Sequence, residues 1–88
     1  MIKLQILGVN GHKSTNVLIS NTIAAIKALG LIVKLEEVND IDQFIKYDLL
    51  GIPALTINGQ LACQQTVPKI EDLVGMLSPL SAPVKLQA

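Results

Sequence analysis

The residues best suited to chemistry lie in one stretch near the start of the chain, where residues 8–15 have the sequence GVNGHKST. Glycine, lysine and serine side by side are the residue types that cradle a phosphate group. A phosphate-binding loop, however, requires four residues between its glycines and an unbroken Gly-Lys-Ser/Thr. Here two residues separate Gly8 from Gly11, and His12 stands between Gly11 and Lys13. We therefore do not expect nucleotide hydrolysis.

The same stretch has two weaker interpretations, as an anion site or as an acid–base site. A loop that enters a helix can hold an anion on its free N–H groups, with Lys13 and His12 beside it. We favour the simpler interpretation that Ser14 is the N-cap or a first-turn residue and that the loop binds water. Catalysis by His12 would need Ser14 next to it and a third group to orient the ring, and the sequence offers no such group. We expect His12 to be a solvated loop residue.

Cys63 is the single cysteine of the chain. One cysteine can form neither an internal disulfide nor a four-ligand zinc site. Free cysteine is among the most buried residue types, so a small core residue is the favoured interpretation. The alternative is a reactive monothiol that forms mixed or intersubunit disulfides. The acidic residues between positions 36 and 48 indicate a solvated face, and neither a metal nor a cofactor is predicted.

Composition narrows the class of protein further. The chain has 88 residues, half of them apolar and 16% charged, with seven basic residues balancing seven acidic ones. This balance, with Phe44 and Tyr47 as the only aromatic residues, argues against nucleic-acid binding. The start of the chain has no signal-peptide pattern and no apolar run long enough to span a membrane, so a cytoplasmic protein is expected. The high apolar fraction suggests a partner surface or a homo-oligomer.

Periodicity predicts the order β-α-β-α-β-β-α in a single domain of residues 1–77, followed by a tail at 78–88. Strands are expected at 2–7 and 31–38, helices at 14–29, 41–49 and 68–77, and a hairpin over 52–63 that turns at Asn58-Gly59. Gly30 should end the first helix, and Asp40 with Gln43 should form a capping box at the second. Apolar residues of the second helix are expected to point inward: Ile41, Phe44, Ile45 and Leu49. The fold class is α/β, a four-stranded mixed sheet flanked by helices that could bury both of its faces.

Three segments resemble the small thioredoxin-like proteins known as redox-active disulfide proteins. The first is Gly8 to Ser14, matched in spacing alone; the second is 51–59, GIPALTING; the third is Val67-Pro68. The resemblance covers roughly residues 1–77 and implies a thioredoxin fold. It also implies a cis bond before Pro53, facing the loop at 8–13, with backbone groups of Ile52 that bind an extended peptide. A buried turn that need not be a site is the favoured interpretation of Pro53 itself.

The departure from that family lies at its two cysteines. Gly11 stands where the resemblance places the attacking cysteine, and Ser14 stands where it places the resolving one. Disulfide exchange requires both thiols, so a redox-inactive binding or assembly module is expected. Its binding residues would be Gly11, His12, Lys13 and Ser14, with Ile52 and Pro53 as the edge for a protein or peptide partner. Two alternatives stay open: an oxidoreductase relative that uses Cys63 alone, and a cysteine-replaced variant of an active protein.

Overall fold

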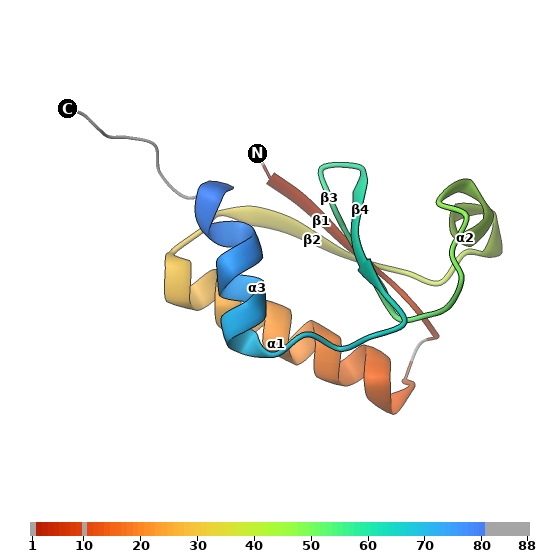
Figure 1. The fold of residues 1–88 in the computed structure, drawn as a ribbon, viewed down its shortest axis with the longest axis horizontal. Helices are drawn as coiled ribbons and strands as arrows, with labels where there is room; N and C mark the ends of the chain where they lie inside the picture. Colours follow the sequence, from red (N-terminus) through yellow and green to blue (C-terminus); the bar gives the residue numbers. More distant parts are fainter. Residues whose placement is uncertain (1, 10, 81–88) are drawn as a thin grey trace.

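A computed structural model describes residues 2–9 and 11–80, and it confirms the predicted element order (Figure 1). The elements are β1 (Ile2–Leu7), α1 (Lys13–Leu29), β2 (Val33–Val38), α2 (Ile41–Lys46), β3 (Ala54–Ile57), β4 (Gln60–Gln64), α3 (Ile70–Leu77) and the short 3-10 helix η1 (Ser78–Leu80). The helix expected at 41–49 is therefore shorter. Part of the predicted tail, Ser78–Leu80, continues α3 as η1, and residues 81–88 lie outside the described residues.

The four strands form one mixed sheet in the order β2-β1-β3-β4. β1 is parallel to β2 and antiparallel to β3, and β4 is antiparallel to β3. The hairpin turns at Asn58 and Gly59, whose φ angles of 50° and 83° are the positive values that the predicted turn needs. Between Leu55 and Thr56 the register of the hairpin shifts, which leaves Ala62 as an extra residue on β4.

α1 and α3 pack together on one face of the sheet and enclose the core (Figure 1). Gly30 ends α1 in the left-handed conformation, with φ of 66°, as predicted. The core consists of side chains with no exposed surface from both the sheet and the two helices: Leu4, Ile6, Leu18, Ala25, Leu55, Leu73 and Leu77. Burial of this face supplies most of the driving force for folding.

The opposite face of the sheet is polar over much of its length, although Leu7 and Ala54, at the end where β1 stops and β3 starts, have no exposed surface. Gln5 is its centre: its Oε1 accepts a hydrogen bond from Thr56 Oγ1 at 3.2 Å, and its Nε2 donates to Glu36 Oε1 at 3.1 Å. Lys3 and Lys34 form ion pairs with Glu36 at 3.6 Å and 3.4 Å. The sheet is flanked by helices as predicted, but this face is covered only in part: Lys3 and Lys34 are exposed, whereas Thr56 has no exposed surface.

α2 lies at the end of the sheet, away from the α1–α3 layer (Figure 1). Ile41 and Ile45 are 67% and 70% exposed, so the prediction that they point inward is wrong. Phe44 and Leu49 are half-buried. The Tyr47 hydroxyl, directly after α2, donates a hydrogen bond to Gln5 Oε1 at 3.4 Å, so this side of the segment faces the sheet while Ile41 and Ile45 do not.

The predicted capping box of α2 is half present. The Asp40 carboxylate accepts a hydrogen bond from the Asp42 N–H at 3.0 Å, which caps the helix. No hydrogen bond from the Gln43 side chain back to Asp40 is found in the described part of the chain.

Candidate functional site

Strand register brings the two candidate segments to the same end of the sheet. Leu7, the last residue of β1, pairs with Ala54, the first residue of β3. The loop that follows Gly8 and the Ile52-Pro53 bond therefore lie next to each other, because one follows the end of β1 and the other precedes the start of the neighbouring strand β3. Gly8 permits this arrangement, because a Cβ there would collide with the Thr15 side chain of α1. Only glycine lets α1 start this close to the end of β1.

The loop residues are positioned by the start of α1. Gly11 is exposed, with φ of 77°, and a Cβ at this position would meet no atom within 4 Å. His12 caps α1, since its Nδ1 accepts a hydrogen bond from the Ser14 N–H at 3.3 Å. Ser14 is therefore a half-buried first-turn residue and not the N-cap, and His12 is exposed yet bonded to the helix. Lys13 begins α1 and is exposed.

This geometry does not support nucleophilic catalysis at Ser14. The nitrogen of His12 that could act as a base accepts the backbone N–H of Ser14, not the hydroxyl. No described residue forms a hydrogen bond that would orient the other ring nitrogen of His12. The loop consequently presents a small, polar surface without an activated nucleophile.

Ile52 and Pro53 form the other side of the site, and the bond between them is cis. Pro53 is buried, and its carbonyl oxygen accepts a hydrogen bond from the Gln65 N–H at 3.0 Å. Ile52 is 38% exposed. Among the described residues, neither the N–H nor the carbonyl oxygen of Ile52 has a hydrogen-bond partner. An exposed backbone donor and acceptor on one residue can pair with an extended chain.

Two glutamines at the end of β4 hold the segment before Ile52 in place. The Leu50 N–H donates to Gln64 Oε1 at 2.8 Å, and Gln65 Nε2 donates to the Leu50 carbonyl oxygen at 3.3 Å. Gly51 is needed here as well, since a Cβ would lie 2.5 Å from Gln65 Cγ. Sequence reasoning did not assign these glutamines to the site, and no motif marks them, because their role depends on the pairing of β4 with β3.

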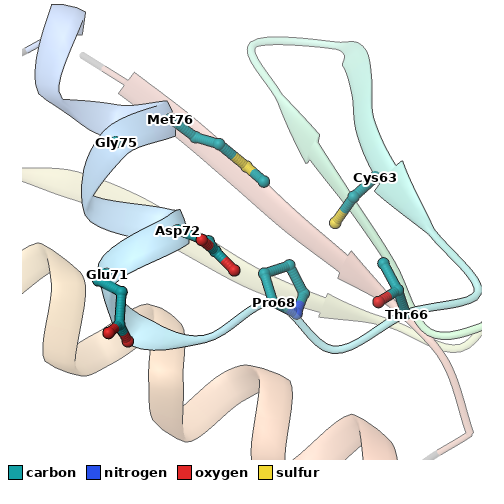
Figure 2. A pocket seen from close by; sticks show the side chains of 7 residues that line it. All are labelled: Cys63, Thr66, Pro68, Glu71, Asp72, Gly75 and Met76. Atoms are coloured by element: carbon teal, nitrogen blue, oxygen red, sulfur yellow. The ribbon is translucent and has the colours of Figure 1, made fainter.

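Cys63 lies on β4, half-buried, and opens onto a groove of about 560 Å³ between β4 and α3 (Figure 2). The other residues lining this groove are Thr66, Pro68, Glu71, Asp72, Gly75 and Met76. Burial raises the pKa of the Cys63 thiol above its usual range, and a hydrogen bond with the Leu55 backbone offsets this only in part. Cys63 pairs with Leu55, which pairs in turn with Ile6, so two strand spacings separate it from β1. Neither Gly11 nor Ser14 lines the groove onto which this thiol opens.

A second groove lies beside Ile52 and was not anticipated from the sequence. It encloses about 530 Å³ between α2 and the segment that follows it. Its lining residues are Ile41, Phe44, Ile45, Asp48, Leu49, Leu50, Gly51 and Ile52. The helical spacing of its isoleucines was visible in the sequence, but it predicted a buried helix face rather than an open groove.

The described residues contain neither a metal-binding cluster nor a membrane-spanning helix. Over residues 2–9 and 11–80, no group of three or more His, Cys, Asp or Glu side chains could hold a metal ion. In the same part of the chain, no helix has both the length and the apolar character needed to cross a membrane.

Comparison with known proteins agrees with this fold. The thioredoxin domain family matches residues 2–78, so the chain belongs to the thioredoxin domain family. Among individual proteins, it is similar to a thioredoxin of Methanothermobacter thermautotrophicus (strain Delta H), with 31% identity over 78 residues. That match covers 89% of this chain and all of the archaeal protein.

Proposed function

We propose that this chain is a peptide-binding or assembly module of the thioredoxin domain family, of the redox-active disulfide type but without its dithiol chemistry. The observation that carries this proposal is the backbone of Ile52, whose N–H and carbonyl oxygen have no partner among residues 2–9 and 11–80, next to a loop that has Gly11 and Ser14 in place of two cysteines. The binding frame of the family is thus kept while its reactive groups are absent.

The loss of dithiol chemistry follows from the atoms available. Reduction of a disulfide needs a thiolate that attacks one sulfur and a second thiol that releases the mixed disulfide. Gly11 has no side chain, and the Ser14 hydroxyl does not form disulfides. Cys63 faces a different groove, and its raised pKa lowers the fraction of thiolate at neutral pH.

Binding would use the backbone of Ile52 in the manner of an added strand. The Ile52 N–H donates to the carbonyl oxygen of one residue of the bound segment, and the Ile52 carbonyl oxygen accepts from the N–H of that same bound residue. This is the exchange seen in one hydrogen-bonded pair of an antiparallel ladder. Gly11, His12, Lys13 and Ser14 form the neighbouring surface. Gly11 has no side chain, and no atom lies within 4 Å of where its Cβ would be, so there is room for the bound chain.

An insulin-reduction assay with dithiothreitol tests the redox part of this proposal. We expect insulin reduction in the presence of the wild-type chain to be no faster than with dithiothreitol alone. The rate with Cys63→Ser should be the same. The double variant Gly11→Cys/Ser14→Cys should gain activity, since it restores both thiols on the same frame. A cysteine at Gly11 adopts an unfavourable positive φ, at a cost of about 1–2 kcal/mol in unfolding free energy, so its fold is checked by circular dichroism.

Either of two results contradicts the proposal. Wild-type turnover clearly above Cys63→Ser would identify Cys63 as a working monothiol. A folded double variant that forms no disulfide on oxidation would show that positions 11 and 14 are not placed as in the family, which removes the structural basis of the comparison.

A further inference from the structure

Exposed apolar side chains gather around α2. Ile41, Ile45 and Leu50 are 67%, 70% and 76% exposed, and Ile52 is 38% exposed. All four line the groove beside α2, together with the half-buried Phe44 and Leu49. A contiguous apolar surface of this kind in a small chain marks a place where another molecule docks. We call the groove of about 530 Å³ lined by these residues the α2 groove.

The α2 groove shares a wall with the peptide-binding backbone. Ile52 lines it, and the N–H and carbonyl oxygen of that same residue have no partner within the described residues. In an extended chain, side chains alternate between two faces, so residues two apart point the same way. A segment that bonds to Ile52 therefore directs alternate side chains over the apolar groove.

The charges around the groove select among occupants. Asp48 lines it, and Asp40 and Asp42 lie at the start of α2, whereas Lys46 is the one basic residue of α2 and stands over the Tyr47 ring at 5.6 Å. In the described part of the chain, the Asp48 carboxylate has no ion pair. A second copy docked symmetrically would bring the same acidic residues face to face. A basic residue on the partner is complementary instead.

We infer that the α2 groove binds an extended peptide segment that carries a large apolar side chain and, two residues away, a basic one. This inference rests on the proposed function, because the main chain of the segment is held by Ile52. The apolar side chain fills the space between Ile45 and Leu50, and the basic side chain pairs with Asp48.

Fluorescein-labelled heptapeptides of the frame Ser-Thr-X-Thr-Z-Thr-Ser test the inference. X is Leu or Ser and Z is Lys or Glu, and a second set of peptides exchanges the positions of X and Z. Affinity for the full chain is measured by fluorescence anisotropy, and backbone amide shifts are followed by NMR. Changing X from Leu to Ser should weaken binding by about tenfold or more, as burial of one large aliphatic side chain predicts. Changing Z from Lys to Glu should weaken it by roughly threefold at low salt, and high salt should remove that difference.

Surface variants locate the effect. Ile45→Ser should abolish the preference for Leu, whereas Ile32→Ser, which changes an 80% exposed isoleucine outside the groove, should keep it. Asp48→Asn should abolish the preference for Lys over Glu. Asparagine suits this position because Asp48 has φ of 53°, which asparagine adopts readily.

The outcomes separate this inference from the proposed function. If the Ile52 amide shifts while affinity is the same for every X and Z, the groove inference is wrong and backbone binding stands. If no peptide binds and the Ile52 amide does not move, both are wrong. If the chain self-associates, Ile45→Ser abolishes this self-association and no peptide is preferred, then the groove binds a second copy of the chain and the inference is wrong.

Discussion

Cys63 and Glu36 lie on opposite faces of the same sheet, and their surroundings shift their acidities in opposite directions. Cys63 pairs with Leu55 on the core side, where burial raises its pKa. Glu36 accepts a hydrogen bond from Gln5, the main cause of its lowered pKa, and the charges of Lys3 and Lys34 lower it further. The uncharged thiol and the charged carboxylate are thus the forms that each face favours.

The thiol of Cys63 should react slowly in the native protein. Because its pKa is raised, the thiolate fraction at neutral pH is lower than in the unfolded chain. Alkylation by iodoacetamide, followed by mass spectrometry at neutral pH, should be roughly severalfold slower in the native chain than in concentrated urea. Cys63→Ser serves as the unlabelled control, and equal rates in both conditions would contradict the assignment of a shielded thiol.

Glu36 should make the stability of the chain depend on pH in the acidic range. Its pKa in the folded protein lies below the ordinary value of 4.5, so its contribution is present above that pH and is lost as the pH falls through the folded pKa. Glu36→Gln should be less stable than the wild type at neutral pH, and the difference should shrink on acidification. Urea denaturation at a series of pH values measures this.

Glu37→Gln is the matched control, because Glu37 is the next residue of β2 and pairs with Ile6 rather than Gln5. If the free energies of unfolding of the wild type and Glu36→Gln differ by the same amount at every pH, the proposed role of Glu36 is wrong.

Two short helices of similar apolar content take different roles in this fold. α3 buries Leu73 and Leu77 completely against the core, and its first-turn residue Asp72 accepts a hydrogen bond from the Lys69 N–H at 3.4 Å. α2 exposes Ile41 and Ile45. α3 therefore contributes to the stability of the fold, whereas α2 presents apolar side chains on the surface.

Truncation of one side chain on each helix should separate these roles. Leu73→Ala should lower the free energy of unfolding by about 2–5 kcal/mol, because it removes a fully buried side chain. Ile45→Ala should lower it by less than about 1 kcal/mol, since its side chain is already 70% exposed. Chemical denaturation of the two variants beside the wild type gives both values, and losses of equal size would show that α2 is part of the core.

The elements were predictable where the signal is local. Alternation along β1, the glycine after α1 and the Asn58-Gly59 turn each act within a few residues, and each was predicted correctly. The spacing of Ile41 and Ile45 reports only that a helix has an apolar face. Whether that face is covered depends on how the helix sits against residues distant in sequence, such as Gln5, which accepts a hydrogen bond from the Tyr47 hydroxyl. The same limit applies to the site, since it is tertiary pairing that leaves the backbone of Ile52 without a partner in the part of the chain that the structure describes.

In the whole molecule, the candidate binding features gather at one end of the sheet. The loop after β1, the segment before β3 and the segment after β4 all lie there (Figure 1). Asn21 on α1 secures the last of these by donating to the Pro68 carbonyl oxygen at 3.0 Å. The hairpin turn lies at the other end, where the Asn58 N–H donates to the Lys3 carbonyl oxygen at 2.7 Å and its Oδ1 accepts from the Lys3 N–H at 2.8 Å.

This separation predicts that a change at the hairpin affects stability but not binding. Asn58→Ala loses the side-chain acceptor for Lys3 and places alanine at a φ of 50°, so the free energy of unfolding should fall by about 1–2 kcal/mol. Peptide affinity, measured by anisotropy under conditions where the variant is folded, should be unchanged. Asn58→Asp keeps the acceptor and should lose less stability, and a large loss of affinity in Asn58→Ala would contradict the separation.

The bulge at Ala62 has a consequence for which chains can join this sheet. β4 and β2 are its two outermost strands, and each leaves one row of backbone groups open to pairing with a foreign strand. On β4 the extra residue interrupts the regular ladder that an incoming strand would need, and β2 carries the charged side chains Lys34, Glu36 and Glu37. Neither edge strand therefore offers the regular, uncharged ladder on which fibril-like stacking depends.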